Sequence, residues 1–340
     1  MRVFQLENDW GMDHLKLSAR PSPEPGPGQV LLRMKASSIN FRDLVVIDGG
    51  YGSQAGTLPL IPLSDGVGEV VAVGPGVRRF CLGDRACPTL FQNWIGGEPD
   101  LQRLAQTLGG PIDGTLAECM CLSEEGMVKV PAYLNDTEAA TLPCAALTAW
   151  SALTVGSPSR PGDHVLVQGC GGVALFAVAF AKLLGAHVTV ISSSEERIER
   201  VKALGADATI NYRTVPEWAK ATREITGGRG YDLIVELGGE KTLPQSLRCI
   251  RAGGTIAMIG MLSGSSMAAS LGPVIARQIR LQGVTVGHRD GFEAMLRAME
   301  MHRVKPVIDR VYPFEELKEA LAHVRSGAQF GKVCVSHISH

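Results

Sequence analysis

The second half of the chain has a regular hydrophobic rhythm from residue 164 onwards. Runs typical of β-strands alternate with helical stretches, and each run carries apolar residues at successive positions. That pattern is typical of strands buried on both faces of a parallel sheet, so we expect an α/β domain with a doubly wound parallel sheet. The expected strands are 164–169, 187–192, 208–212, 232–237, 255–260 and 280–287.

The first 130 residues follow a different pattern. Short β-like runs at 30–39, 66–74 and 127–131 are separated by turn signals rich in glycine and proline, which predicts a β-rich, barrel-like domain. Asn135 can cap a largely apolar helix over 138–154. The tail has mixed character, and we expect it to complete the first domain. The predicted domains are therefore 1–130 with 291–340, and 131–290.

Composition narrows the function classes. Of 340 residues, 45% are hydrophobic and 20% charged, and the net charge of −1 gives no electrostatic footprint for nucleic acid or an anionic membrane. Eight cysteines lie scattered without a framework, which suits reduced thiols. With no signal-peptide pattern and no apolar run long enough to span a bilayer, we expect a cytoplasmic enzyme acting on a small molecule.

A glycine-rich turn between the first expected strand and its helix predicts a dinucleotide site. The spacing is Gly169-x-Gly171-x-x-Ala174, with alanine in place of the third glycine, and Gly172 and Val173 open the helix. Glycines let the backbone turn sharply and approach a pyrophosphate, and the helix start offers free N–H groups. The alternative is a purely structural turn, but the strand over 187–192 returns as a βαβ unit requires.

Several separated motifs resemble the medium-chain dehydrogenase/reductase superfamily, and in particular its quinone-reductase-like branch. They cover essentially the whole chain: Asn40-Phe-Arg-Asp43 followed by Gly50-Tyr51, Ser64-Asp-Gly66, Leu142 to Trp150, the glycine turn, and Gly331-Lys332-Val333. The resemblance implies a GroES-like β-rich catalytic domain, a Rossmann domain that is doubly wound, and a homodimer.

The same resemblance places the zinc ligands of related alcohol dehydrogenases on this chain. The segment Ser38 to Asp43 lacks the expected cysteine, Ser64-Asp65 stands where a His-Glu pair is expected, and only Cys144 matches. One thiolate with one carboxylate cannot form the three-ligand site of a catalytic zinc, so we predict a zinc-free enzyme and a buried Cys144. His337 and His340 form a terminal pair that we interpret as part of a disordered end.

The cofactor is expected to be NADPH, with NADH less favoured. Where an NAD site usually carries an acid, the chain has Ser192, Ser193 and Ser194, which leave room for a 2′-phosphate. By resemblance, Arg197 matches a lysine that binds this phosphate and Tyr212 a tyrosine that flanks it. A solvated helix charge is the alternative for Arg197. Thr148 and Lys332 match further cofactor-binding positions of the family.

Without zinc, hydrogen-bond donors must stabilise the negative charge that hydride transfer builds on an acceptor oxygen. Asn40 and Tyr51 are the candidate donors, and Asp43 either takes a catalytic part or orients the loop. The insertion 88–114 contains Phe91, Trp94 and Ile95, which either line an acceptor pocket or cover the barrel.

The sequence therefore predicts a zinc-independent, NADPH-dependent oxidoreductase that transfers hydride to a quinone or an activated enone. Two alternatives stay open: an alcohol dehydrogenase or ketone reductase of the same superfamily, and a non-catalytic NADPH-binding protein.

Overall fold

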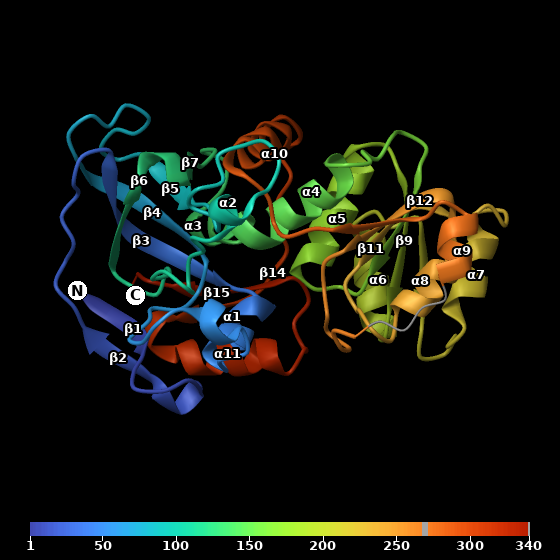
Figure 1. Ribbon diagram of the computed structural model, residues 1–340, viewed down its shortest axis with the longest axis horizontal. Coiled ribbons are helices and arrows are strands. Elements are labelled where there is room, and N and C mark those ends of the chain that lie inside the picture. Colours follow the sequence, from blue (N-terminus) through green and yellow to red (C-terminus); the bar gives the residue numbers. More distant parts are fainter. Residues whose placement is uncertain (267–270, 339–340) are drawn as a thin grey trace. The chain divides into compact units, whose positions relative to one another are not determined.

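Two β-sheets of different kinds organise the chain, which the computed structural model describes over residues 1–266 and 271–338 (Figure 1). The chain divides into two compact units, Met1–Leu147 with Val286–His340, and Thr148–Thr285. Each unit has its own hydrophobic clusters. The GroES-like and Rossmann-type architecture predicted from the sequence is confirmed.

The first unit is built on a seven-stranded sheet with the path β14-β15-β3-β4-β5-β7, to which β6 adds by pairing with β3. Its pairs are antiparallel except β14 with β15. A separate antiparallel pair joins β1 and β2. The strands are β1 (Arg2–Leu6), β2 (Leu15–Ala19), β3 (Gln29–Ile39), β4 (Asp65–Val73), β5 (Arg85–Pro88), β6 (Cys119–Ser123), β7 (Met127–Lys129), β14 (Ile308–Pro313) and β15 (Lys332–Ser336).

Helices close the first unit from both ends of the chain. The core packs N-terminal residues such as Leu15 and Ile47 against C-terminal ones such as Leu321 and Val335. Red β14 and β15 continue the sheet beside blue β3 in Figure 1. The C-terminal segment therefore completes this unit. Its helices are α1 (Phe41–Ile47), α2 (Leu101–Leu104), α3 (Asp136–Ala140), α10 (Arg289–His302) and α11 (Leu317–Arg325).

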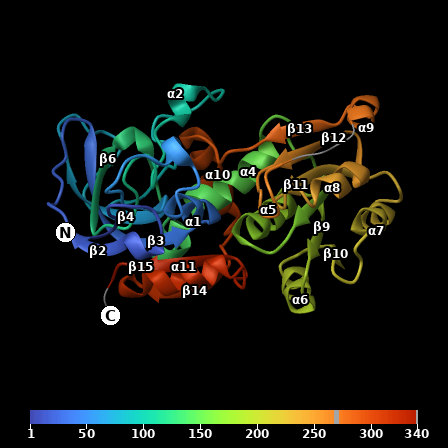
Figure 2. The same ribbon diagram turned by 60° about the horizontal axis from the view of Figure 1, so that its bottom comes forward.

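The second unit has a six-stranded, fully parallel sheet in the order β10-β9-β8-β11-β12-β13. Because the chain moves outward in one direction from β8 and then in the other from β11, right-handed crossovers put α5 and α6 on one face and α7 and α8 on the other (Figure 2). The strands are β8 (His164–Gln168), β9 (His187–Ser192), β10 (Ala208–Asn211), β11 (Tyr231–Glu236), β12 (Ile250–Met258) and β13 (Arg280–Gly283). The helices are α4 (Leu147–Thr154), α5 (Gly172–Leu183), α6 (Glu195–Ala203), α7 (Trp218–Ile225), α8 (Leu243–Cys249) and α9 (Leu271–Ala276).

The unit boundaries differ from the expected 131 and 290. Asn135 caps α3 as predicted, with its side chain accepting a hydrogen bond from Glu138 N at 2.8 Å. The expected single helix over 138–154 instead contains a π-helical turn at Leu142–Ala146, which begins around Pro143, a residue with no N–H to donate. Residues up to Leu147 belong to the first unit. The last strand also stops at Gly283, and the chain rejoins the first unit from Val286.

The C-terminal end is ordered as far as it is described. His337 N donates to Lys35 O at 2.9 Å, and its ring Nε2 lies 2.9 Å from Ser37 Oγ. The expectation of disorder was wrong for His337, because the chain after β15 continues its antiparallel pairing with β3. His340, the other member of the predicted pair, lies outside the described residues.

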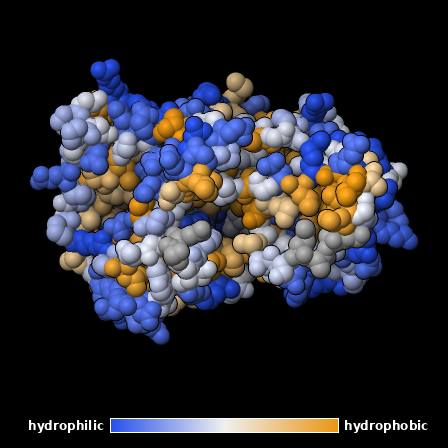
Figure 3. Space-filling view, viewed as in Figure 1, coloured by the Kyte–Doolittle hydropathy of each residue, from blue (hydrophilic) through white to orange (hydrophobic). Residues whose placement is uncertain are grey.

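The second unit carries an exposed apolar surface around α9. Met261, Leu262, Leu271 and Ile275 are each more than half exposed, and Figure 3 shows hydrophobic residues gathered there. The neighbouring β13 is the last strand of its sheet. The homodimer implied by the resemblance stays a prediction, and this surface is compatible with it. Within the described residues, no helix is long and apolar enough to cross a membrane.

Candidate active site and dinucleotide site

The glycine turn of the second unit has the geometry that a pyrophosphate site needs. Gly169 follows β8 with φ +79°, a value that side chains rarely adopt, and Gly171 is the N-cap of α5 without a side-chain cap. A Cβ added at Gly169 or Gly171 would meet no atom within 4 Å, so open space lies in front of the turn. The first N–H groups of α5, from Gly172 and Val173, are thus available to an anionic ligand.

The end of β9 combines small hydroxyl residues with two arginines. Ser192 is buried, Ser193 is partly buried, and Ser194 is the N-cap of α6, 3.5 Å from Arg197 N. Burial raises the pKa of the Cys170 thiol, while the Ser192 hydroxyl and the guanidinium groups of Arg197 and Arg200 lower it. Both arginines therefore lie near the turn residue Cys170. Ser192 to Ser194 carry no acid of the kind that binds the ribose diol in NAD sites.

Arg200 was not predicted from the sequence. It follows Arg197 by three positions on α6, and residues with that spacing share one face of a helix. Applying this rule to the predicted helix would have found it. Glu195, an acidic residue at the start of the same helix, accepts a hydrogen bond from Asn211 Nδ2. Tyr212 is exposed and its N–H donates to Ser192 O at 3.0 Å, so it flanks the same strand end as expected.

In the first unit, Asn40 and Asp43 are held together at the start of α1. Asn40 is the N-cap residue, its backbone N–H donates to Asp43 Oδ2 at 2.7 Å, and Asp43 is completely buried. Arg42 Nη1 lies 3.3 Å from Asp43 Oδ1. Since the carboxylate is used by these contacts, Asp43 orients the loop, as one of the two expected alternatives stated.

Lys332 is the buried cation of this region, and it fixes the side chain of Asn40. Its Nζ donates to Ile39 O at 2.7 Å and to Asn40 Oδ1 at 2.5 Å, and lies 3.9 Å from Asp65 Oδ2. The family resemblance suggested a cofactor contact for Lys332. In the structure the Lys332 ammonium bonds to residues of its own unit, because β15 runs beside the end of β3, and the cofactor contact stays a prediction.

Asp65 collects the remaining donors of this network. Burial raises the pKa of its carboxyl, whereas Lys332, the Asn40 amide, the Cys144 N–H and the Ser64 hydroxyl lower it. The Cys144 N–H donates to Asp65 Oδ2 at 3.2 Å and the Ser64 hydroxyl to Asp65 Oδ1 at 3.2 Å. Asn40 Nδ2 is buried and makes no hydrogen bond of ordinary geometry to any residue that the structure describes. A buried donor left unsatisfied is costly, which makes this amide a candidate ligand contact.

Tyr51 is the second predicted donor and is partly exposed. Burial raises the pKa of its hydroxyl, Arg42 lowers it, and Asp43 and Cys144 raise it. These influences place Tyr51 near the same network, and the raised pKa keeps its hydroxyl protonated. Phe91 and Trp94 are buried, with ring centroids 5.7 Å apart, so they cover the barrel and do not line an open pocket. Thr148, a predicted cofactor contact, is buried near the start of α4.

The residues at the expected zinc positions do not fit a catalytic zinc ion. Burial raises the pKa of the Cys144 thiol to about 12, and Asp65 raises it further, against Lys332. A zinc ligand must be the thiolate, and here a buried ammonium already neutralises the neighbouring carboxylate. Over residues 1–266 and 271–338, no group of three His, Cys, Asp or Glu side chains could hold a metal ion.

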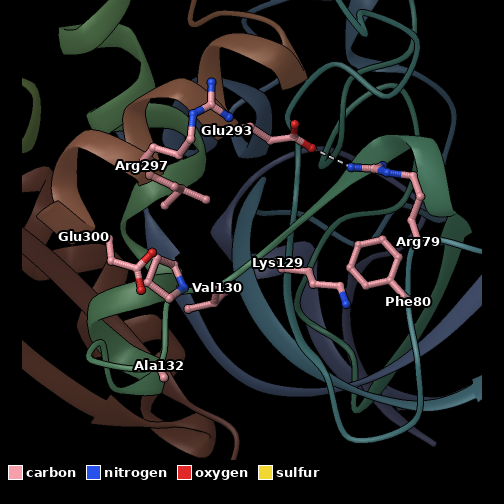
Figure 4. Close-up of a pocket in the computed structure, with 10 residues that line it drawn as sticks. Arg79, Phe80, Lys129, Val130, Ala132, Glu293, Arg297 and Glu300 are labelled. Carbon is pink, nitrogen blue, oxygen red and sulfur yellow. Dashed lines mark hydrogen bonds and ion pairs between the residues drawn. The ribbon is translucent and has the colours of Figure 1, made fainter.

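A pocket of about 550 Å³ lies elsewhere in the first unit, between β7 and α10 (Figure 4). Its charged groups are mostly paired within the protein: Arg79 with Glu293 at 2.6 Å, and Lys129 with Asp84 at 2.7 Å. None of the predicted site residues lines it, so it has no part in the candidate site.

Family models match most of the chain. The alcohol dehydrogenase GroES-like domain matches residues 26–132, and the zinc-binding dehydrogenase model matches residues 172–301. A zinc-type alcohol dehydrogenase-like protein of Schizosaccharomyces pombe is 41% identical over 95% of both chains. The chain belongs to the medium-chain dehydrogenase/reductase superfamily and is an oxidoreductase of that family.

Solved structures of proteins with related names have the same fold. A putative alcohol dehydrogenase from Sinorhizobium meliloti superposes with a TM-score of 0.93 at 42% identity, covering 98% of both chains. An NAD-dependent alcohol dehydrogenase gives 0.90 at 35% identity, covering 99% of both. At 25% identity, a mycobacterial quinone oxidoreductase gives 0.82 and covers 99% of both chains. A crotonyl-CoA carboxylase/reductase in complex with NADP gives 0.88 at the same identity, covering 99% of this chain and 94% of its own.

The Asp43 carboxyl provides a test of the buried network. Burial raises its pKa from 3.8 to about 6, against Arg42. A carboxyl that binds its proton more tightly in the folded state favours folding most below its unfolded pKa, and this contribution is lost as the pH rises through 6. We expect the free energy of unfolding of the wild type, relative to Asp43→Asn, to fall by about 2 kcal/mol between about pH 4 and pH 7, measured by urea denaturation.

Asp84→Asn is the matched control. Partial burial raises the pKa of Asp84, but Lys129 and the Cys81 N–H outweigh it and hold that pKa below its ordinary value. The wild type should therefore gain stability relative to this variant as the pH rises from below 4. Equal pH dependence in the two variants would contradict the assignment of a raised pKa to Asp43.

Proposed function

We propose that the protein is a zinc-independent, NADPH-dependent reductase of quinones or activated enones. The observation that carries the proposal is the buried network around Lys332. It fixes the Asn40 side chain near Asp65, with Nδ2 outside any hydrogen bond of ordinary geometry among the described residues. It offers a neutral hydrogen-bond donor in a region where metal-dependent relatives are expected to place a zinc ion. The mycobacterial quinone oxidoreductase among the similar structures supports the acceptor class.

NADPH is proposed because the end of β9 has no acid and lies near Arg197 and Arg200. Its pyrophosphate would meet the turn at Gly169 to Gly172, and its 2′-phosphate would meet Ser192, Ser193 and the arginines. The NADP-bound crotonyl-CoA carboxylase/reductase supports this choice, whereas the NAD-dependent alcohol dehydrogenase supports NADH. The hydroxyl side chains at Ser192 to Ser194, with Arg197 and Arg200 near Cys170, favour NADPH.

When bound, the reduced nicotinamide supplies a hydride to the electron-poor carbon of an enone or to a quinone. The electron pair displaced from the acceptor moves to its carbonyl oxygen. Asn40 Nδ2 and the Tyr51 hydroxyl donate hydrogen bonds to this oxygen as its charge develops. The Tyr51 hydroxyl also delivers a proton to the reduced acceptor, and water restores it. Lys332 and Asp43 hold the donors in place.

The second candidate function is an alcohol dehydrogenase or ketone reductase. The names of the 41% identical relative and of the 35% identical structure favour it. The residues at the zinc positions argue against the metal-assisted form of this reaction. A non-catalytic NADPH-binding protein would bind the cofactor without turnover.

The first test is activity. NADPH oxidation, followed by absorbance, should be fastest with quinones or enones among an acceptor panel that includes simple ketones and aldehydes. Asn40→Ala should lower kcat roughly tenfold or more, because one donor to the developing charge is lost. The matched variant Asn93→Ala, in the insertion over the barrel, should leave kcat unchanged. Preference for simple ketones, or an unchanged kcat in Asn40→Ala, would contradict the proposal.

The second test is metal content. The segment Ser38 to Asp43 lacks the expected cysteine, Ser64 stands at a second ligand position, and Lys332 neutralises the Asp65 carboxylate. The purified protein should therefore hold far less than one zinc ion per chain. Chelators should not change its activity. Stoichiometric zinc that is lost together with activity would overturn the zinc-independent assignment.

The third test concerns the 2′-phosphate. A hydrogen bond to a charged group contributes roughly 1.5–3 kcal/mol, or about 10- to 150-fold in affinity. Arg197→Glu should therefore raise the Kd for NADPH at least tenfold and leave that for NADH nearly unchanged. Ser192→Asp should improve NADH binding by adding an acceptor for the ribose diol.

Lys202→Glu makes the same change of charge on the same helix and is the control, because Lys202 pairs with Glu199 at 2.7 Å. It should alter neither Kd by more than about twofold. If Arg197→Glu weakened both cofactors equally, Arg197 would not bind the phosphate and the choice of NADPH would lose its support.

A further inference from the structure

A buried amide-carboxylate pair joins the two central strands of the second unit. Gln168 is the last residue of β8 and Glu236 the last residue of β11, and both are at least 95% buried. These strands lie beside each other where the strand order reverses. Ligands of doubly wound sheets bind outside the carboxyl ends of the strands at this switch point.

The Glu236 carboxylate accepts hydrogen bonds at both oxygens. Oε2 accepts from Gln168 Nε2 at 2.6 Å and from Ser246 Oγ at 2.5 Å. Oε1 accepts from Gly238 N at 3.1 Å, from Gly239 N at 3.0 Å and from Thr242 Oγ1. No Lys or Arg within the described residues forms an ion pair with it, so donors alone compensate its charge.

The amide oxygen of Gln168 binds the loop after β11, which also supplies donors to Glu236. Its Oε1 accepts from Leu237 N and Gly238 N, each at 3.1 Å. The next residue along the chain is Gly169, the first glycine of the pyrophosphate turn. The pair therefore connects the turn after β8 to the loop after β11.

A third loop is attached through the backbone. Glu236 O accepts from Ile259 N at 3.0 Å and Gly260 N at 3.1 Å, and Gly238 O accepts from Ser263 Oγ at 2.7 Å. A Cβ at Gly260 would come within 2.1 Å of Leu237 O, so the loops after β11 and β12 have little room to shift. The side chains of the pair thus hold the loop after β11, and the backbone of Glu236 and Gly238 holds the start of the loop after β12.

We propose that Gln168 and Glu236 are positioning residues that shape the site for the nicotinamide half of the dinucleotide. The adenosine half is assigned to the ends of β9 and β10, through Ser192, Arg197 and Tyr212. The remaining half then crosses the switch point toward the loops after β11 and β12, which the pair holds. This inference rests on the proposed dinucleotide function. It adds that different residues hold the adenosine half and the nicotinamide half of the cofactor.

The division can be tested with a cofactor fragment. Adenosine 2′,5′-bisphosphate has the adenosine end of NADPH and no nicotinamide. Glu236→Gln turns one acceptor oxygen into an NH2 group that faces other donors. We expect the Kd for NADPH to rise roughly tenfold or more, as when one buried bond to a charged group is lost. The Kd for adenosine 2′,5′-bisphosphate should stay within about twofold of that of the parent protein.

Exchanging the two residues provides a rescue. The double variant carries Gln168→Glu and Glu236→Gln. The new carboxylate at position 168 accepts from Leu237 N, Gly238 N and the new amide at position 236. The oxygen of that amide accepts from Gly239 N and Thr242 Oγ1. The exchanged pair should recover most of the NADPH affinity. Thr242→Val removes a single bond to Glu236 and should raise the NADPH Kd a few-fold, which keeps the test available if Glu236→Gln does not fold.

Thr222→Val is the matched control for lost stability. Thr222 is a fully buried hydroxyl on α7, and its carbonyl bonds to Tyr231 at the opposite, amino end of β11. Its thermal stability should fall while both Kd values are unchanged. A parallel loss of both ligands in Glu236→Gln, no loss of either, or an exchange without recovery would overturn the proposal.

The test of the Gln168–Glu236 pair can be distinguished from a failure of the NADPH assignment. If the parent protein fails to bind adenosine 2′,5′-bisphosphate, the 2′-phosphate assignment fails. The same comparison made with NADH and adenosine 5′-monophosphate then decides the role of the pair, with the same expected loss for the whole dinucleotide only.

Discussion

The first unit depends on how it accommodates one buried ammonium group. Lys332 is 3% exposed, and a charged group removed from water is tolerated only when it is paired and hydrogen bonded. Its partners are Ile39, Asn40 and Asp65, which lie 293, 292 and 267 positions earlier in the chain. The interaction therefore fastens the last strand to the end of β3 and the start of α1. Every candidate donor of this unit is positioned next to that junction.

This junction also explains why a family described as zinc-binding can include a chain with this set of residues. A metal site needs ligands that are anionic or neutral donors around an open position. Here the single expected carboxylate faces an ammonium, the expected thiol has a raised pKa, and serine replaces a third ligand. Positive charge is thus supplied by the Lys332 ammonium, whose nearest partners are oxygen atoms. A hydrogen bond from a neutral amide is the polar contact that the network leaves for a ligand.

Much of the fold could be predicted because its signals are local. The apolar runs of the parallel strands, the glycine spacing at 169–174 and the Asn135 cap each follow from a few adjacent residues. The boundary at 131 could not be predicted, because residues 136–147 pack with a sheet that is completed by β15 from the other end of the chain. The contact of Lys332 with Asn40 could not be predicted for the same reason. Its sequence neighbours say nothing about Asn40, and only the antiparallel pairing of β15 with β3 brings them together.

Each unit buries a carboxylate, and the groups that stabilise its charge differ between the two units. This difference affects the function that we propose for each network. Asp65 is neutralised by a cation, so its region is close to electrically balanced and suits an acceptor on which negative charge grows. Glu236 is satisfied by an amide, two hydroxyls and two backbone N–H groups, so its negative charge remains. A charge held only by hydrogen bonds is sensitive to the position of every donor, which makes it a precise constraint on the loops that supply them. We therefore assign the Asp65 network to the proposed reaction and the Glu236 network to the positioning of loops.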